Sequence, residues 1–357
     1  MQEVRGSRGR GPALLLLLAF FLSAGCRHEG EASARKTARV IYDADDREEL
    51  EFSAYAGLGS VALALIPGSG LDALREGQLI PESDPWCAGE RFANQPRAAV
   101  CSAVALTERY VLTAAHCVPN QETCRELALV RNYVIPAVGD FSPSALDAFG
   151  CDSVVSSKRS ELIEAEAFDF AIVRLDRPLP DFHTATLDIA SALPDEVQIS
   201  IGASAGLPLK VSSGKVAAVD EQHGYFRLAL DVAAGNSGGG VFNERGQLTG
   251  IVVSGAQDYL EDPEGCVTER VVDTDQQGAA ELANSASAVV RQVCTEDQSL
   301  PFCALGASSR DGLHAVGGGC GVVGDPQRAT ASKLLGVTMM LLASLRLRER
   351  GGRRRHR

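Results

Sequence analysis

Short apolar runs recur along the middle of the chain, and their length constrains the fold more than any other feature. Clusters of Gly, Pro, Asp and Ser separate them, as expected of strands joined by turns. Because little helical periodicity lies between the runs, the pattern favours a β-barrel or β-sandwich over alternating strands and helices. The strand-length runs lie at 61–65, 98–106, 110–115, 127–130, 154–155, 170–175, 197–201, 215–219, 225–230, 241–242 and 248–254.

One segment, 278–294, departs from this pattern. Its apolar side chains fall at helical spacing, so we predict a single helix that packs against the β structure. The residues that would share this face are Leu282, Ala286, Val289, Val290 and Val293.

Charge and composition exclude several classes of function. The formal net charge is −12 and the pI about 5.1, so no extended basic surface for nucleic acid is expected. The six histidines are scattered and no Cys-x-x-Cys pair occurs, so we predict neither a metal site nor another cofactor. An apolar content of 45% is ordinary for a folded protein, and one β-rich domain with tails fits the length best.

Three segments carry candidate chemistry. The run at 110–115 ends in small residues and is followed by His116 and Cys117. A lone histidine is more often structural than catalytic, so its partners decide its role. Asp169 opens the apolar run that follows it, where it could also simply cap a strand end.

Glycines surround Ser237 in the third segment, Gly235–Gly240. Such glycines let the backbone turn sharply and point its amides into a cleft, which is the geometry that stabilises an oxyanion. A phosphate-binding glycine loop is the competing interpretation. It is disfavoured because the segment lacks a Gly-Lys-Ser/Thr ending and no helix pattern follows it.

Together, Leu-Thr-Ala-Ala-His-Cys, Asp-Phe-Ala-Ile-Val and Gly-Asn-Ser-Gly resemble three motifs of the trypsin/chymotrypsin-like serine peptidases, and they occur in the same chain order. The resemblance covers about 40–294. It implies an all-β fold of two six-stranded antiparallel β-barrels with a C-terminal helix. It also implies that His116 is the general base, that Asp169 orients it, and that Ser237 is the nucleophile.

Further roles follow from the same resemblance. The amides of Gly235 and Ser237 would form the oxyanion hole. Cys101 has the spacing from Cys117 that the family uses for the disulfide closing the histidine loop. Residues Val253, Ser254 and Gly255 would form a pocket wall that pairs with the substrate backbone, although the same run could be an ordinary core strand.

The resemblance is weakest for specificity. Asp231 lies at the offset from Ser237 where trypsin keeps the carboxylate that binds Lys or Arg side chains, which suggests a preference for basic residues. Alternatively, Asp231 simply ends the run at 225–230. Asn236 stands where trypsin has the aspartate that pairs with its freed N-terminus. The chain is therefore more similar to glutamyl endopeptidases and other bacterial trypsin-like peptidases, and we predict that activity needs no such N-terminal ion pair.

The beginning of the chain has the zones of a secretory signal. Arginines precede an apolar run at 13–22 that is too short to span a bilayer, and Ser-Ala-Gly-Cys follows. We therefore predict an exported protein. The last four residues also resemble a lipobox in which Cys26 would be lipidated. Because the favoured leucine falls one place early, cleavage by an ordinary signal peptidase is an equal alternative.

The end of the chain combines a glycine-rich stretch around Cys320, an apolar stretch at 334–345 and an arginine cluster. This combination resembles the sorting tags of some Gram-negative bacteria, which are cut after export and fix a protein to the cell surface. A marginal anchor helix and a disordered basic tail are the alternatives. We divide the chain into a signal at 1–26, a tether at 27–39, a peptidase domain at 40–298, a linker at 299–328 and a tail at 329–357.

The ten cysteines of an exported chain should mainly form disulfides. With Cys26 and Cys320 assigned to the terminal signals, an even number remains. Cys124 and Cys151 are a plausible pair because both flank the same predicted strand region. The sequence leaves the pairing of the others open, namely Cys87, Cys266, Cys294 and Cys303.

The predicted function is that of a serine endopeptidase. It would be secreted or held at the surface or outer membrane of a Gram-negative bacterium, and would act as a monomer on peptide or protein substrates through an acyl-enzyme. The alternative is a catalytically inactive peptidase-like module that binds peptides at the cell surface. Loss of a triad member would favour it, and none is lost. A purely structural barrel would leave the intact triad unexplained.

Overall fold

The computed structural model of the protein describes residues 41–42, 44–78, 86–138, 140–160, 168–181, 185–188, 190, 192–255, 259–261, 263, 265–272 and 281–304. The predicted signal with Cys26, the tether, nearly all of the linker with Cys320, and the tail lie outside these residues. No helix in the described part of the chain is both long enough and apolar enough to cross a membrane.

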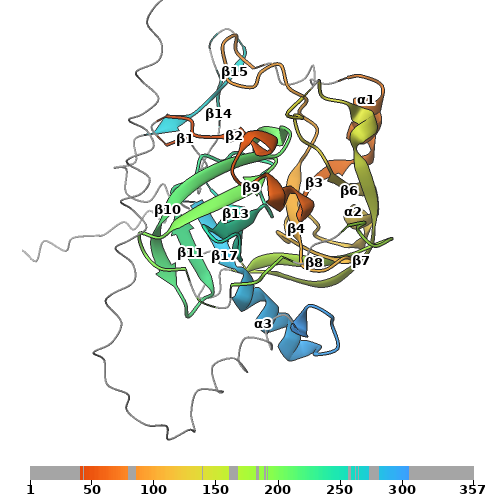
Figure 1. Ribbon diagram of the computed structural model, residues 1–357, viewed down its shortest axis with the longest axis vertical. Coiled ribbons are helices and arrows are strands. Elements are labelled where there is room, and N and C mark those ends of the chain that lie inside the picture. Colours follow the sequence, from red (N-terminus) through yellow and green to blue (C-terminus); the bar gives the residue numbers. More distant parts are fainter. Residues whose placement is uncertain are drawn as a thin grey trace, which may run out of the picture.

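The first half of the described chain forms a closed antiparallel barrel of six strands in the order β3-β4-β5-β8-β7-β6 (Figure 1). Its strands pair with their sequence neighbours except in two places, where β5 pairs with β8 and β3 pairs with β6. These two pairings close the barrel. The bounds are β3 (Ala62–Pro67), β4 (Cys101–Ala105), β5 (Tyr110–Thr113), β6 (Leu127–Arg131), β7 (Asp147–Arg159) and β8 (Asp169–Leu175).

The second half forms a sheet in the order β11-β17-β13-β12-β9-β10-β2, and pairing of β10 with β11 closes six of these strands into a second barrel. The fold class predicted from the sequence is therefore confirmed. The bounds are β2 (Glu48–Glu49), β9 (Val197–Gly202), β10 (Lys210–Asp220), β11 (Tyr225–Leu228), β12 (Gly240–Asn243), β13 (Leu248–Ser254) and β17 (Glu281–Ser285).

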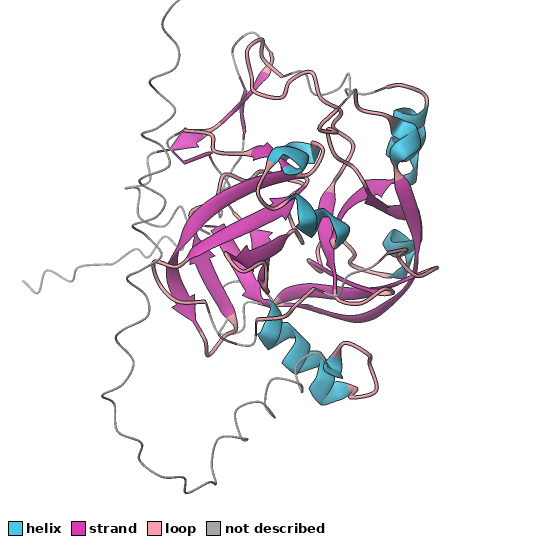
Figure 2. Cartoon of the chain, in the orientation of Figure 1, coloured by secondary structure: helices cyan, strands magenta, loops and turns pink. Residues whose placement is uncertain are grey.

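Short elements decorate the barrels (Figure 2). Strand β1 (Ile41–Tyr42) pairs in parallel with β16 (Val271–Val272), and β14 (Tyr259–Glu261) pairs with β15 (Val267–Glu269). The helices are α1 (Gly68–Arg75), α2 (Gln121–Glu126) and α3 (Ala286–Glu296), with 3-10 turns η1 (Leu50–Phe52), η2 (Ala56–Ser60), η3 (Pro143–Ala145) and η4 (Ser204–Gly206).

The helix predicted at 278–294 is only partly correct. Its first described residues form β17, which pairs with β11 and β13 and completes the second barrel. The helix begins at Ala286 because the Ser285 side chain accepts a hydrogen bond from the Ala288 amide and so caps it. Helical spacing alone did not detect this switch from strand to helix.

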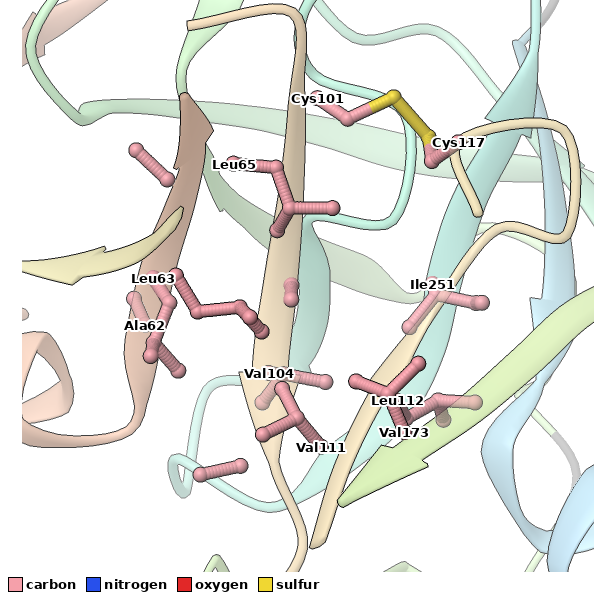
Figure 3. Packing of buried hydrophobic residues seen from close by; sticks show 14 of the residues in the cluster. Ala62, Leu63, Leu65, Cys101, Val104, Val111, Leu112, Cys117, Val173 and Ile251 are labelled. Atoms are coloured by element: carbon pink, nitrogen blue, oxygen red, sulfur yellow. A yellow bond between two sulfur atoms is a disulfide. The ribbon is translucent and has the colours of Figure 1, made fainter. Parts of the chain in front are cut away.

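The two barrels share a continuous apolar core. Leu112 and Val173 of the first barrel belong to the same buried cluster as Ile251 of the second, and all three are fully buried. Figure 3 shows these side chains at one level of the cluster, with the Cys101–Cys117 disulfide at the far end of the strands. Burial of side chains of this size stabilises by about 1.5–3 kcal/mol each, so the barrels form one packed unit.

Four disulfides occur among the described residues. Cys101 bonds Cys117, as the resemblance implied, and Cys124 bonds Cys151, as their flanking positions indicated. The structure also pairs the cysteines that the sequence left open, joining Cys87 to Cys266 and Cys294 to Cys303.

Candidate active site

Strand register brings His116 and Asp169 together. Strands β5 and β8 are antiparallel, and Thr113 at the end of β5 faces Ala171 near the start of β8. The loop that follows β5 therefore passes the first residue of β8. The sequence favours this arrangement because β8 is apolar along nearly its whole length, and its buried side chains hold it in the barrel.

Asp169 bonds the histidine twice. Its Oδ2 lies 2.8 Å from His116 Nδ1, and its Oδ1 accepts the backbone N–H of His116 at 3.0 Å. The carboxylate is buried, whereas the His116 side chain is 27% exposed. With Nδ1 donating to the carboxylate, Nε2 is left as the proton acceptor. This is the tautomer that a general base requires.

Asn284 supports Asp169 from the second barrel. Its side-chain oxygen accepts the backbone N–H of Asp169 at 2.8 Å, and Asn284 itself is fully buried on β17. The sequence analysis missed this residue because it placed 278–294 in a helix. A buried asparagine in a predicted strand would have been the only available signal.

A disulfide packs beside the histidine. A ring nitrogen of His116 and the sulfur atoms of Cys101 and Cys117 all lie within 4.8 Å of one another. Because both sulfurs are bonded to each other, neither can act as a thiolate ligand. The cluster is therefore a clamp on the histidine loop and does not have the chemistry of a metal site.

The Ser237 loop lies directly against this clamp. The Ser237 carbonyl oxygen is 3.6 Å from Cys117 Sγ and accepts the backbone N–H of Ser102 at 2.7 Å. The contact with the sulfur is one of packing, since a disulfide has no proton to donate. The Ser237 backbone is thus adjacent to Cys117, the residue that follows His116, whose imidazole lies beside Asp169. A catalytic triad of these three residues stays a prediction.

Two glycines give the Ser237 loop its shape. Gly235 and Gly238 have φ of +100° and +82°, which residues with a Cβ rarely adopt. A Cβ on Gly238 would lie 2.2 Å from the Ser102 carbonyl oxygen, so this glycine is also required by close packing. The Gly238 amide donates to the carbonyl of Val252 at 2.7 Å, which fixes the loop on β13.

Ser102 connects the first barrel to this loop, and the sequence analysis did not single it out. Its Oγ donates to the Gly235 carbonyl at 2.7 Å and accepts the Ala203 amide at 2.8 Å. Its own carbonyl accepts the Thr113 hydroxyl at 2.7 Å. The predicted oxyanion residue Gly235 is therefore fixed by a side chain from the other barrel.

Asn236 bonds within the second barrel. It is buried, and its Nδ2 donates to Ser200 Oγ at 3.0 Å. The uncharged amide is thus engaged where trypsin would pair a carboxylate with its N-terminus. This geometry agrees with the expectation that no N-terminal ion pair is needed, which stays a prediction.

Asp231 occupies the predicted specificity position but is engaged elsewhere. Its two carboxylate oxygens accept the backbone amides of Tyr42 and Asp46, both at 2.7 Å. Burial raises the pKa of Asp231 to about 7, the nearby Asp46 carboxylate adds to the rise, and the two amide bonds oppose it. The structure gives this carboxylate a role in holding the N-terminal segment, and a preference for basic side chains stays a prediction.

The predicted pocket wall follows β13. Val253 is buried in the core, Ser254 is half-buried, and Gly255 directly follows the strand. The structure therefore supports the ordinary role of Val253 as a core residue. Pairing of this strand with a substrate backbone stays a prediction.

Comparison with solved structures found similar folds. The chain resembles the VesB protease of Vibrio cholerae, with 15% identity over 72% of this chain and 67% of that one and a TM-score of 0.45. It resembles kallikrein-related peptidase 10, with 15% identity over 68% and 98% of the two chains and a TM-score of 0.43. It also resembles an inactivated protease paralogue of the scabies mite, with 16% identity over 71% and 98% and a TM-score of 0.43.

A comparison with curated proteins gave no significant match. The family model described as a trypsin-like peptidase domain matches residues 101–251. This range contains His116, Asp169 and Ser237, so all three lie in the part of the chain that is similar to a trypsin-like peptidase domain.

Proposed function

We propose that the protein is a serine endopeptidase in which His116, Asp169 and Ser237 form a catalytic triad. The observation that carries the proposal is the bond of 2.8 Å between His116 Nδ1 and the buried Asp169 carboxylate, directly beside the Ser237 loop. A buried carboxylate that bonds a partly exposed imidazole is the arrangement expected of a general base, because it orients the ring and leaves Nε2 to accept a proton.

The reaction would follow the roles that this geometry allows. Ser237 Oγ attacks the carbonyl carbon of the peptide bond while His116 Nε2 accepts the hydroxyl proton. Asp169 stays ionised and stabilises the imidazolium. The proton then passes to the leaving amine, and water repeats the sequence to release the acid from the acyl-enzyme.

The oxyanion of each tetrahedral intermediate would be held by the amides of Gly235 and Ser237. The positive φ of Gly235 and the Ser102 bond to its carbonyl support this role, because they fix the orientation of the turn before substrate arrives. Preorganised donors of this kind contribute about 2.7–4 kcal/mol each to lowering the barrier.

A fluorophosphonate probe tests the proposal. We expect the folded protein to be labelled stoichiometrically at Ser237, and Ser237→Ala to abolish both labelling and peptide hydrolysis, with turnover reduced at least about 10⁴-fold. Equal thermal stability of the variant and the wild type would show that the fold is intact. A folded wild type that binds peptides but is not labelled would instead favour the inactive binding module.

We further propose that the protein is exported, with its surface attachment made through Cys26 or through the linker containing Cys320 and the tail that follows it, and that it acts as a monomer. The disulfides support export, because such bonds persist mainly in oxidising compartments. Fractionation of producing cells, with mass spectrometry of the mature termini, tests the location and both attachment sites. Recovery of the full-length chain in the cytoplasm would contradict export.

A further inference from the structure

A segment before the first barrel lies along the second one. We name residues 41–42 and 44–49 the N-terminal strap. Its β2 strand adds to the second sheet by pairing with Lys210 and Val211 of β10, and its β1 strand pairs with β16 (Figure 1). The strap is an internal segment of the sequence, because residues 1–40 precede it.

Arg47 anchors the strap from a fully buried position, with 0% of its surface exposed. Its guanidinium forms ion pairs with Asp45 at 2.8 Å and with Glu269 of β15. Burial alone would lower the pKa of Arg47, but these two carboxylates raise it above its ordinary value, so the side chain stays charged. Burying a guanidinium costs several kcal/mol, which demands complete pairing and one fixed geometry.

A second buried cation, Lys210, holds the end of the strap at Glu49. The fully buried Lys210 donates to Glu49 of the strap at 2.9 Å and to Gln95 at 2.7 Å. Phe92 lies beneath both cations, with its ring centre 5.4 Å from the Arg47 guanidinium and 4.8 Å from the Lys210 ammonium. The strap is therefore held at several points. Among its described residues, Tyr42 and Asp46 bond Asp231 just before the turn described next, and Arg47 contacts Ser204 beside that turn.

Arg47 connects the strap to the Ser237 loop through Ser204. One guanidinium nitrogen lies 3.4 Å from Ser204 Oγ, and the same oxygen accepts the Ala233 amide at 2.8 Å. Ala233 begins the turn that directly precedes Ser237, since its carbonyl accepts the amide of Asn236 at 3.0 Å, and the next turn, closed by the Gly239 amide on the Asn236 carbonyl at 2.8 Å, contains Ser237. The guanidinium thus favours the Ser204 rotamer whose oxygen receives Ala233.

The 3-10 turn η4, which contains Ser204, also supports Gly235 directly. A Cβ on Gly235 would lie 2.4 Å from the Ala203 carbonyl and 2.8 Å from the Gly206 amide, so η4 packs against the backbone of the predicted oxyanion residue. Any shift of η4 would therefore move Gly235. The side-chain amide of Asn236 donates to Ser200 Oγ. Because this side chain is uncharged, an N-terminal amino group would find no charge there to neutralise.

From this chain of contacts we propose that the uncut N-terminal strap holds the Ser237 loop in its working geometry, with Arg47 as a positioning residue that acts through Ser204. The inference rests on the proposed peptidase function. It assigns to an internal segment the support that a freed N-terminus would otherwise give, so the chain is active without cleavage between Ile41 and Glu49.

A double-mutant cycle tests the connection. Ser204→Ala removes one oxygen and should lower kcat and the rate of fluorophosphonate labelling roughly tenfold, less than the 10²–10³ lost with an oxyanion donor itself. KM for a short peptide should change less than about threefold, because the loop affects the transition state more than binding. Arg47→Lys keeps the charge but loses the planar fork, so a similar loss is expected.

The double variant decides between a relay and two separate supports. If Arg47 acts through Ser204, combining Arg47→Lys with Ser204→Ala should cost no more than the larger single loss. Ser53→Ala is the control, because the half-buried Ser53 Oγ also accepts a backbone amide, that of Tyr55 at 3.1 Å, and donates to the Leu50 carbonyl at 2.9 Å, so both bonds lie within its own turn. This control should retain full kcat.

Four outcomes would overturn the inference while leaving the peptidase proposal intact. The first is a labelling rate of Ser204→Ala equal to that of the wild type, and the second is a pair of kcat losses that multiply fully in the double variant. The third is an equal loss of kcat in Ser53→Ala, and the fourth is activity that appears only after the intact mass shows cleavage within 41–49. If Arg47→Lys does not fold, the Ser204→Ala rate and the intact mass still decide. Failure of wild-type protein to label would contradict the proposed function itself.

Discussion

The two loops that meet in the candidate active site are held by different means. The His116 loop is positioned within its own barrel: it leaves β5, contacts the start of the paired strand β8 and is closed by the Cys101–Cys117 disulfide. The Ser237 loop has no covalent tie among its described contacts. It depends on glycine conformations and on side chains that are distant in sequence, among them Ser102 and Ser204.

This difference shows that one site can combine a covalently restrained half with a half that is held by tertiary contacts. The first half should keep its geometry under conditions that loosen the second. Hydrogen bonds from distant residues contribute only about 0.5–1.5 kcal/mol each, so the Ser237 loop is sensitive to single substitutions outside the triad.

The largest effect should follow loss of the histidine clamp. Cys101→Ala with Cys117→Ala opens a loop with a sequence separation of 16, which should lower the free energy of unfolding by about 3 kcal/mol. Because Cys117 also packs on the Ser237 carbonyl, kcat should fall roughly 100-fold, as expected when a catalytic group moves by about 1 Å. Urea denaturation and peptide kinetics measure the two losses.

The disulfide between Cys294 and Cys303 provides the control, with a sequence separation of 9 at the end of α3. Cys294→Ala with Cys303→Ala should cost a similar free energy of unfolding, somewhat less because the loop is shorter, yet retain kcat. An equal fall in kcat in both variants would mean that the clamp acts only through global stability.

The same contrast explains how much of the molecule the sequence predicts. Apolar runs and turn residues indicate an all-β barrel or sandwich and the positions of most strands, whereas the two six-stranded barrels and the Cys101–Cys117 disulfide were implied by the resemblance of three motifs to a known family. The pairing of Cys87 with Cys266 spans 179 residues and could not be read, since no local signal records which distant segments meet.

The supports of the site were missed for the same reason. Arg47, Ser102 and Asn284 lie in unrelated segments, and only the closed barrels bring them to the residues they bond. The offset of Asp231 from Ser237 could be read from the sequence, but the amides that bond its carboxylate come from residues 185 and 189 positions away. Chemistry at a site is thus more predictable than the contacts that hold it.

A smaller effect should follow loss of the contact between the barrels at Ser102. Ser102→Ala leaves the buried Ala203 amide and Gly235 carbonyl without their partner, which should lower the free energy of unfolding by about 1–3 kcal/mol. Because Gly235 then loses one restraint, kcat should fall roughly tenfold while the His116–Asp169 bond is unaffected. Kinetics and denaturation on the same preparations measure both effects.

Thr249→Val is the matched control for Ser102→Ala. The buried Thr249 hydroxyl lies 2.7 Å from Gln198 Oε1 and 3.0 Å from the Val241 carbonyl oxygen within the second barrel, and it donates its one proton to either of them. The variant should therefore lose comparable stability and keep its kcat. If Ser102→Ala also keeps its kcat, the Ser237 loop does not need the first barrel, and the contrast between the loops disappears.

The smallest effect on activity is expected for substitution of Asp231, which should instead change how stability depends on pH. Its folded pKa of about 7 exceeds the ordinary value of 3.8, so the folded state binds this proton more tightly than the unfolded chain does. Its contribution is therefore fully present below about pH 4 and is lost as pH rises through 7. Asp231→Asn cannot titrate, so the free energy of unfolding of the variant should lack this decline.

Denaturation at a series of pH values between 4 and 8 measures this difference, and kcat of Asp231→Asn at pH 8 should stay within about threefold of the wild type because Arg47 still anchors the strap. The protection of the Tyr42 and Asp46 amides against exchange, relative to the intrinsic rate at each pH, should change with pH in the wild type alone, because their N–H groups bond this carboxylate. If the free energy of unfolding of the variant and of the wild type changes with pH in the same way, Asp231 is not buried in solution. The buried cations Arg47 and Lys210 would then hold the strap, and the His116 loop and the Ser237 loop would respond to pH alike.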